Sequence, residues 1–232
     1  MFSAVIKKNL NEKIATQLIN KILNDKLKPG DKLPSERELA LAMKVNRNTL
    51  REALRKLEIL GLINIKKSDG IYIKNYKESG NLELLKIILQ TESSLSPVIL
   101  EGILHVRRIV IPEMASLAAE NISSEEIIEI PEIIENTNLT IAEKDLEIHK
   151  IIASASGNLF YSFFLNFFND TFMEYSHLYF SEDKNIKKSS NFHRQIFKAL
   201  KNRDSDKCKK LMLDILLYAE RQILKKMELK HD

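Results

Sequence analysis

The chain of 232 residues has a single cysteine, Cys208, and no hydrophobic run that approaches the length of a membrane span. One cysteine excludes an intrachain disulfide, which is typical of proteins in the reducing cytoplasm. A membrane-spanning helix needs about 20 consecutive apolar residues, and the N-terminal sequence MFSAVIKKNLNEKIA lacks the apolar core of a secretory signal. These absences predict a soluble cytoplasmic protein without a membrane partner.

Internal repeats and low-complexity tracts are absent as well, and the composition is that of a globular protein. Hydrophobic residues make up 44% of the chain and charged residues 29%, which is enough apolar material for packed cores. Because domains usually contain about 100–150 residues, the length suits two modest domains better than one.

Positive charge is concentrated in the N-terminal third. Residues 1–76 contain 16 Lys and Arg against 8 Asp and Glu, whereas residues 77–232 contain 20 against 24. The net charges of these segments, +8 and −4, account for the +4 of the whole chain. A basic domain joined to a mildly acidic one indicates a polyanionic partner for the first domain, although surface charge distributed by chance would give the same sums.

The N-terminal third has the pattern of three helices. The first is indicated by apolar residues at helical spacing, at Ile14, Leu18, Ile22 and Leu23. The turn Pro29-Gly30-Asp31 follows it, and Ser35 with Glu38 has the spacing of a capping box that begins a second helix. Asn46 is placed to cap the third helix at its start, and Gly61 is placed to end it in a left-handed conformation.

Two β-rich segments come next, at residues 62–65 and 71–73, with the hairpin turn signal Ser68-Asp69-Gly70 between them. Three helices followed by a hairpin is the order of a winged helix-turn-helix, so residues 1–75 are predicted to form this domain with a two-stranded wing. The short polar segment YKESGN, residues 76–81, is interpreted as a linker.

The remainder, residues 82–232, is predicted to be an all-helical bundle, which makes the protein mainly α. The expected helices cover residues 82–91, 96–120, 123–136, 141–155, 158–180, 187–202 and 204–229. Pro131, within EEIIEIPEIIEN, predicts a break or kink in the third of these helices.

The segment VNRNTLREALRKLEILGLI, residues 45–63, has polar residues at its start and apolar residues behind them. In a helix-turn-helix the second helix enters the major groove, and its N-terminal residues face the base edges. Arg47 and Arg51 are four positions apart on one helical face, and arginine can contact guanine with two hydrogen bonds. The short polar side chains Asn46, Asn48 and Thr49 are suited to phosphates and bases near the helix N-terminus.

Arg37 early in the second helix and Lys67 at the hairpin tip are further candidates for DNA contact. A solvated arginine-rich helix is the alternative for the spacing of Arg47 and Arg51 alone. The ordered set of capping box, break, polar helix start, Gly61 and hairpin favours DNA binding.

With these residues in place, LKPGDKLPSERELALAMKVNRNTLREALRKLEILGLI resembles the DNA-binding domain of the GntR family of bacterial transcription regulators, over about residues 10–74. The resemblance implies that the DNA contacts are made by Arg37, Asn46, Arg47, Asn48, Thr49 and Arg51. The family usually has glycine at both ends of the wing tip, whereas Ser68 precedes Gly70 here. The minor-groove contact by Lys67 therefore depends on a tip that departs from the family pattern.

The second domain resembles the FCD-type effector domain of the FadR-like branch of this family, in VRRIVIPEMASLAAENIS, DLEIHKIIASASGN and FHRQIFKALKNRDSDKCKKLM. Asp145 and His149 are four apart on one helical face, and His193 is on a later helix, so the three side chains could bind a cation inside the bundle. The alternative is a hydrogen-bonded Asp–His pair. The resemblance implies a divalent metal (Zn, Ni or Mn) held by one Asp and three His, but Ile215 stands at the fourth position.

Arg107 is the candidate for effector binding, because the family often binds small organic acids and arginine can hold a carboxylate with two hydrogen bonds. A surface salt bridge is the alternative for either Arg107 or its neighbour Arg108. The segment FYSFFLNFFNDTFMEYSHLYF, residues 160–180, has ten aromatic residues, most of them expected in the core or at a subunit contact. Together with Ile215 they could also form a pocket for a more apolar effector, and His177 among them could replace the missing ligand.

The sequence thus predicts a ligand-responsive transcription regulator that binds a palindromic DNA operator as a homodimer. A repressor released by a small metabolite is favoured, with an organic acid as the first choice of effector. A metal-dependent enzyme fused to a DNA-binding head is the alternative, but no separate base or nucleophile motif supports it, so no enzymatic activity is predicted. A sequence-neutral nucleoid protein is disfavoured by the polar start of the recognition helix.

Overall fold

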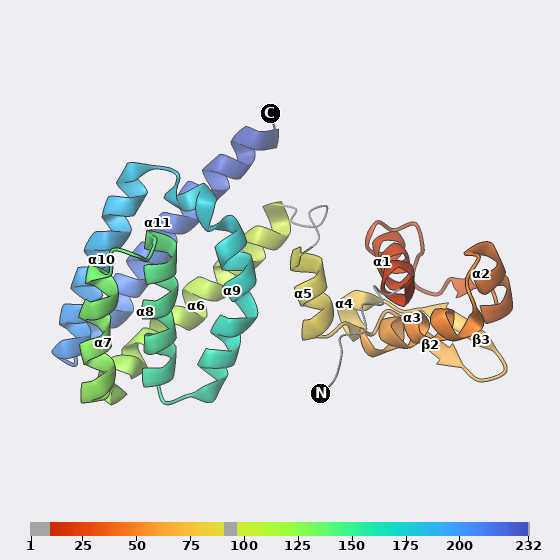
Figure 1. The fold of residues 1–232 in the computed structure, drawn as a ribbon, viewed down its shortest axis with the longest axis horizontal. Helices are drawn as coiled ribbons and strands as arrows, with labels where there is room; N and C mark the ends of the chain where they lie inside the picture. Colours follow the sequence, from red (N-terminus) through yellow and green to blue (C-terminus); the bar gives the residue numbers. More distant parts are fainter. Residues whose placement is uncertain (1–9, 91–96, 232) are drawn as a thin grey trace, which may run out of the picture. The chain divides into compact units, whose positions relative to one another are not determined.

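The computed structural model describes residues 10–90 and 97–231 (Figure 1), which form two compact units divided between Ile88 and Leu89. For residues 90, 97–98, 170–171, 174–175 and 227–231, only the backbone is described. Residues 1–9 of the expected first domain, and the expected helix ends at residues 91 and 96, lie outside the described residues. No helix in the described ranges is both long and apolar enough to cross a membrane.

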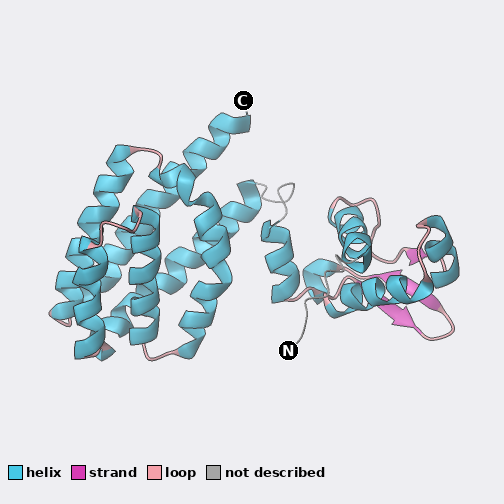
Figure 2. Ribbon diagram, viewed as in Figure 1, coloured by secondary structure: helices cyan, strands magenta, loops and turns pink. Residues whose placement is uncertain are grey.

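The first unit contains three helices, a small sheet and two further helices (Figure 2). In chain order they are α1 (Leu10–Leu23), β1 (Lys32–Leu33), α2 (Glu36–Ala42), α3 (Arg47–Ile59), β2 (Ile63–Lys66), β3 (Gly70–Ile73), α4 (Tyr76–Ser79) and α5 (Leu82–Gln90). The expected capping box begins α2: the Ser35 hydroxyl accepts from the Glu38 N–H, and the Glu38 carboxylate accepts from the Ser35 N–H. The winged helix-turn-helix prediction is confirmed.

The core of the first unit is built around α3. Leu50, Leu54 and Leu57 on its inner face are fully buried, and α1 packs against this face with Ile14, Leu18 and Ile22, among others. The apolar positions of both helices recur at the three- and four-residue spacing of an amphipathic helix. The burial of one face of α3 therefore leaves the opposite face exposed.

The sheet has three strands rather than the expected two, in the order β1-β3-β2, with antiparallel neighbours. The third strand arises at the predicted turn, where the Gly30 N–H donates to the Ile73 carbonyl and the Ile73 N–H donates to the Asp31 carbonyl. A two-residue strand has too little hydrophobic alternation to be detected in the sequence. It ties the base of the hairpin to the segment that precedes α2.

Residues 76–81, expected as a linker, form part of the first unit. Tyr76–Ser79 is the short helix α4, the Ser79 hydroxyl donates to the Gly61 carbonyl at 2.6 Å, and the Asn81 amide donates to the Ile59 carbonyl at 2.9 Å. Leu84 of α5 is buried in the core of this unit. The polar residues Ser79 and Asn81, which suggested a linker, instead donate hydrogen bonds to the end of α3.

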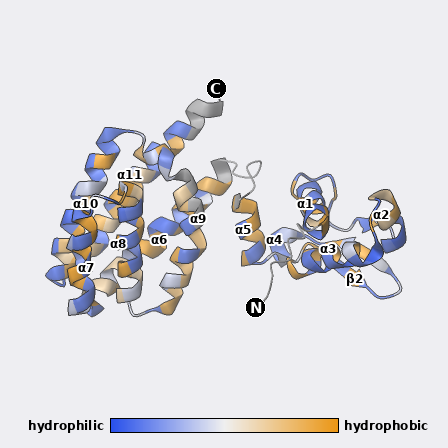
Figure 3. Ribbon diagram, in the orientation of Figure 1, coloured by the Kyte–Doolittle hydropathy of each residue, from blue (hydrophilic) through white to orange (hydrophobic). Residues whose placement is uncertain are grey.

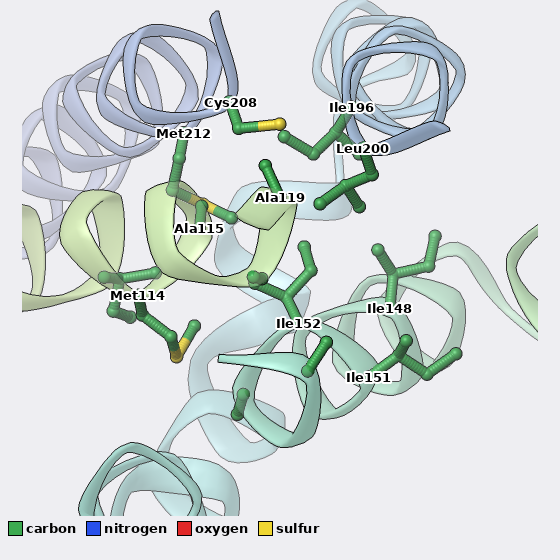
Figure 4. Packing of buried hydrophobic residues seen from close by; sticks show 14 of the residues in the cluster. Met114, Ala115, Ala119, Ile148, Ile151, Ile152, Ile196, Leu200, Cys208 and Met212 are labelled. Carbon is green, nitrogen blue, oxygen red and sulfur yellow. The ribbon is translucent and has the colours of Figure 1, made fainter. Parts of the chain in front are cut away.

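The second unit consists of α6 (Pro97–Asn121), α7 (Ser124–Glu135), α8 (Ile141–Ala155), α9 (Leu159–Phe180), α10 (Asp183–Lys201) and α11 (Ser205–His231). The long helices α6 and α11 pack against each other, and α8 contacts α6, α7, α9 and α10. Between them lies a core of aliphatic and sulfur-containing side chains, including Met114, Ile148, Ile152, Ile196 and Met212 (Figure 4). The prediction of an all-helical second domain is confirmed.

One helix boundary in this unit needs correction, and Pro131 does not break its helix. Helix α10 begins at Asp183 rather than at residue 187, and α7 continues through Pro131 to Glu135. A proline removes one hydrogen-bond donor and crowds the preceding turn. Its neighbour Ile130 is completely buried, so the packing of α7 against α8 and α10 offsets that cost. Pro112 is likewise inside α6.

Gly61 is the residue whose conformation we expect to matter most for the stability of the first unit. It ends α3 with φ +75°, and a Cβ atom there would lie 1.9 Å from the Ser79 carbonyl oxygen. Gly61→Ala should therefore lower the free energy of unfolding by about 3 kcal/mol or more, from backbone strain and a backbone clash together. Urea unfolding followed by circular dichroism measures this.

Gly30→Ala is the matched control, because Gly30 has φ +92° but nothing within 4 Å of its added Cβ. This variant should lose only the cost of strain, about 1 kcal/mol. Equal losses for the two variants would show that α4 is not docked against the end of α3.

Candidate DNA-binding surface and effector pocket

The outer face of α3 presents the predicted DNA-contacting residues to solvent. Arg47, Asn48 and Arg51 are exposed there, and Arg37 is exposed on α2. The residues on α3 are positioned by its buried inner face, so an exposed polar surface results directly from the packing of the leucines behind it. The structure therefore brings these residues to one helix-turn-helix, as the sequence predicted.

Asn46 and Thr49 stabilise the start of α3, in addition to the DNA contact that the sequence predicts for them. The Asn46 carboxamide oxygen accepts from the Thr49 N–H at 2.8 Å and from the Thr49 hydroxyl at 3.0 Å, which makes Asn46 the N-cap of α3. An N-cap contributes about 1 kcal/mol to helix stability. The Asn46 side-chain NH₂ remains as the donor that can reach a phosphate or base.

Glu36, which the sequence did not single out, holds Arg51 in place. The Arg51 Nε lies 2.9 Å from a Glu36 carboxylate oxygen, and Arg51 is more than half exposed, so this ion pair contributes little stability. The pair affects the direction of the side chain, because it occupies Nε, while the terminal guanidinium nitrogens of Arg51 have no partner in the described part of the chain and can donate to a base. The acidic residue at the start of α2 was indistinguishable in sequence from an ordinary first-turn glutamate.

The wing tip is held by contacts of Asp69 with Tyr72 and Lys32 that the sequence did not predict. Ser68 adopts φ +65°, and the Tyr72 hydroxyl donates to the Asp69 carboxylate at 2.9 Å. This hydrogen bond, helped by the charge of Lys32 at 3.5 Å, lowers the pKa of Asp69. The tip thus keeps a defined conformation without a first glycine, and Lys67 is exposed on it.

The second unit has a cavity of about 70 Å³ between α6, α8, α9, α10 and α11, with a smaller cavity of about 20 Å³ beside it. Arg107, Asp145, His149, Phe168 and Phe172 line both cavities. The larger one lies between the main core and a separate apolar cluster of Leu100, Leu104, Tyr179 and Ile223. Its walls are largely apolar, and the charged groups are concentrated at one place.

Asp145, His149 and His193 meet in a hydrogen-bonded set. The His193 Nε2 lies 2.8 Å from Asp145 Oδ1, and the His149 Nδ1 lies 2.7 Å from the Asp145 backbone oxygen. Burial alone would raise the pKa of Asp145, but the neighbouring His149, the hydrogen bond from His193 and the charge of Arg107 together lower it. Burial lowers the pKa of His149. An ionised Asp145 beside a neutral His149 is the arrangement these effects favour.

Arg107 lies at the cavity and Arg108 does not. The Arg107 guanidinium carbon is 5.6 Å from the centre of the Phe172 ring, and burial lowers the pKa of Arg107 while the Asp145 carboxylate opposes that shift. Arginine remains protonated even so. Arg108 instead pairs with Glu220 at 3.2 Å, as the salt-bridge alternative predicted for one of the two arginines, and effector binding by Arg107 stays a prediction.

The aromatic helix α9 contributes to the core, the pocket and the surface. Tyr161 and Phe164 pack on the main core, and Phe168 and Phe172 line the cavities. Phe160 and Phe163 are exposed. Tyr161 and Phe164 thus have the expected core role, Phe168 and Phe172 supply part of the pocket wall, and a subunit contact by the exposed aromatics stays a prediction. His177 is exposed and does not line either cavity.

Comparison with known sequences matches both halves of the chain to characterised types of domain. The profile described as bacterial regulatory proteins, gntR family, matches residues 10–73, and the FCD domain profile matches residues 102–217. A fatty acid metabolism regulator protein of Shewanella denitrificans is 30% identical over 183 residues, 78% of this chain and 77% of the relative. The HTH-type transcriptional regulator YcbG of Bacillus subtilis is 28% identical over 97% of this chain and 94% of the relative.

The chain belongs to the GntR family. Its second unit contains the FCD domain of that family. Among solved structures, a GntR protein of Streptococcus agalactiae has a TM-score of 0.50 at 24% identity, covering 91% of this chain and 99% of its own. Lar, which controls expression of the Listeria monocytogenes agr system, has a TM-score of 0.55 at 16% identity, covering 95% and 99%. These two likenesses show a shared fold.

The predicted metal ligands Asp145, His149 and His193 lie together in the FCD domain, and metal binding by them stays a prediction. Among the described residues, no group of three or more His, Cys, Asp or Glu side chains is placed to hold a metal ion. The His193 Nε2 and Asp145 Oδ1 are joined to each other, and Ile215 lines the cavity where a fourth ligand was expected. His149 Nε2 is a buried ring nitrogen without a partner among the described residues, and one nitrogen does not make a metal site.

The metal content of the purified protein tests this assignment. We expect protein dialysed against a mild chelator to contain much less than one zinc, nickel or manganese ion per chain, and its thermal unfolding to be unchanged by the chelator. Ile215→His adds an imidazole beside Asp145 and His149, so it should increase zinc affinity, whereas the size-matched control Ile215→Leu should not. Stoichiometric metal that survives the chelator in the unmodified protein would contradict the assignment.

Proposed function

We propose that this GntR-family protein is a transcription regulator that binds a palindromic operator as a homodimer. The observation that carries the proposal is the placement of Arg47, Asn48 and Arg51 on the exposed face of α3. The side chains on the opposite face of this helix are completely buried. One recognition helix reads only a few base pairs, so two copies related by two-fold symmetry are needed for a specific site.

The regulator is proposed to respond to a small molecule bound in the FCD domain, and to act as a repressor released by that molecule. Support comes from the cavity lined by Arg107, a cationic group suited to a carboxylate. The apolar lining and the relatives named for fatty acid metabolism favour an acid with an apolar part. Release requires the effector to bind more tightly to the conformation with low DNA affinity.

Arginine substitutions on α3 test the DNA-binding part of the proposal. Arg47→Ala and Arg51→Ala should each weaken binding to an operator selected from random DNA by about 1–3 kcal/mol, because each removes a contact to a base edge. Both should also reduce the preference for operator over random DNA. Fluorescence anisotropy titration of the two DNAs at fixed salt measures both quantities.

Two controls separate base contact from loss of positive charge. Arg55→Ala removes an exposed arginine one turn further along α3, and Lys67→Ala removes the exposed lysine of the wing tip. Each should weaken operator and random DNA by similar factors, because a phosphate contact carries no sequence information. Full discrimination retained by both the Arg47 and Arg51 variants would overturn the assignment of α3 as the recognition helix.

The oligomeric state provides a second test. The full-length protein should sediment as a dimer at micromolar concentration, whereas a fragment of residues 1–88 should be a monomer if the FCD domain supplies the dimer contact. The fragment must extend to Ile88 because Leu84 belongs to the core of the first unit. The fragment should also bind DNA with a shallower dependence on salt, because it neutralises fewer phosphates. A monomeric full-length chain would exclude the palindromic mode of binding.

A further inference from the structure

Helix α10 of the second unit has a row of basic side chains along its exposed face. Its inner face is buried in the bundle through side chains such as Ile196 and Leu200, so the direction of the outer face is fixed. Residues at successive spacings of seven, four and three lie within about 60° of one another around a helix with 3.6 residues per turn. The exposed residues at these spacings form what we call the basic stripe: Lys187, Arg194, Lys198 and Lys201.

The basic stripe contains no acidic side chain. Asn191, on the same side of the helix, is neutral, and Asp183 belongs to the first turn of α10. In the described part of the chain no side chain of the stripe makes an ion pair or a hydrogen bond. By contrast, the neighbouring helix α7 has five glutamates and no basic residue. The second unit therefore separates its charges, although residues 77–232 are acidic overall.

This arrangement is unfavourable in the protein alone. Like charges three or four positions apart on a helix repel each other, as Arg194, Lys198 and Lys201 do. The helix dipole favours cations in the last turn, where Lys198 and Lys201 lie, but it does not favour Lys187 or Arg194 earlier in the helix. A solvated helix face usually has charges of both signs. An anionic partner is therefore the simplest explanation of an uninterrupted basic stripe.

The length of the basic stripe suits duplex DNA. From Lys187 to Lys201 a helix rises about 21 Å at 1.5 Å per residue. Duplex DNA has one negative charge per about 1.7 Å of its axis, so this length faces on the order of ten phosphates. Contacts of Lys and Arg with phosphates release counterions and need no base contact. The chain belongs to a family of DNA-binding regulators, so binding through α3 would place α10 in a high local concentration of phosphates.

We propose that the basic stripe of α10 is a second DNA-binding surface, which contacts the phosphates of duplex DNA without regard to sequence. It goes beyond the proposed function, because it adds to the affinity for DNA and not to the preference for an operator. The flank of a bound operator and a separate duplex present the same phosphate backbone. Contact with a flank strengthens binding to one long duplex, whereas contact with a separate duplex joins two DNA molecules.

Neutral variants of the full-length protein test the proposal. The stripe variant removes three charges from α10 through three substitutions: Arg194→Gln, Lys198→Gln and Lys201→Gln. A matched control removes one exposed arginine and two exposed lysines from α11: Lys210→Gln, Arg221→Gln and Lys225→Gln. The exposed Asp214 lies on the same side of α11 as these three residues, so the control row is not uniformly basic.

Titration by fluorescence anisotropy at several salt concentrations measures contact with a flank. The probes are an operator selected from random DNA, the same operator with long flanks, and a random duplex of the longer length. Each phosphate contact that is lost lowers the slope of log affinity against log salt by about 0.9. With both long duplexes, the stripe variant should lose at least about 0.9 of this slope and bind at least about fivefold more weakly at low salt. The trimmed operator should show no such loss, and the α11 control should behave as the unmodified protein does.

A bridging measurement tests contact with a separate duplex. Operator DNA is immobilised, the full-length protein is bound to it, and a labelled random duplex is added. If the stripe binds this second duplex, the unmodified protein and the α11 control should retain it, and the stripe variant should retain at least about fivefold less. A positive result in either measurement supports the proposal and identifies which DNA is bound.

Failure of both measurements, or equal losses for the stripe variant and the α11 control, would refute the second DNA-binding surface. Dissociation of an assembly of the full-length protein by the stripe substitutions, seen in sedimentation, would also refute it, because the stripe would then be a contact between chains. Circular dichroism shows whether the variants are folded. The single substitution Arg194→Gln, compared with Arg221→Gln, should give a smaller change in the same direction, so the test does not depend on a folded triple variant.

The preference for operator over random DNA separates this proposal from the proposed function. A stripe variant that binds more weakly and keeps the same preference supports both the stripe and α3 as the recognition helix. If the unmodified protein shows no preference while the stripe variant still loses affinity, the role of α3 is contradicted and the second surface stands. If the preference is present and the stripe variant equals the α11 control in every measurement, the second surface is excluded and the proposed function stands.

Discussion

The burial of one face of α3 is the interaction on which the DNA-binding unit depends. Leu50, Leu54 and Leu57 are each completely removed from solvent, and full burial of such side chains contributes about 1.5–3 kcal/mol apiece. Because these residues recur every three or four positions, their burial fixes the rotation of the helix about its own axis. The rotation in turn decides that Arg47 and Arg51 point outward. The direction of these two arginines is therefore set by apolar contacts on the far side of the helix.

In the second unit the same helices form both the core and the pocket, whereas in the first unit the core and the exposed polar surface lie on opposite faces of α3. The core of the second unit is divided by a cavity, so α6, α9 and α11 each contribute side chains to apolar packing and to the pocket. Figure 3 shows hydrophobic residues distributed along these helices. The polar residues Asp145, His149 and His193 lie within this apolar environment, where hydrogen bonds are strong and unpaired groups are costly. Asp145 and His193 satisfy each other's hydrogen bonding. Next to them, His149 Nε2 has no partner among the described residues and is available to a ligand.

Much of this architecture could be predicted from the sequence, because it depends on local patterns. Capping boxes, helical spacing and the hairpin signal each involve residues within a few positions of one another, and they located α1 to α3 and the hairpin. The third strand and the docking of α4 were not predictable in this way, since they depend on hydrogen bonds between distant segments, such as Ser79 with Gly61. The same limit applies to the pocket. Spacing identified Asp145 and His149 as neighbours, but the bond to His193 and the free Nε2 depend on side-chain orientations that no spacing specifies.

The contact between α4 and the end of α3 has a mechanical consequence. Ser79 and Asn81 bond to the carbonyl groups of Gly61 and Ile59, and Leu84 of α5 is anchored in the same core. The recognition helix and α5 are therefore coupled without an intervening flexible joint. A displacement of α5 would therefore either break these contacts or move α3, with Arg47 and Arg51, along with it.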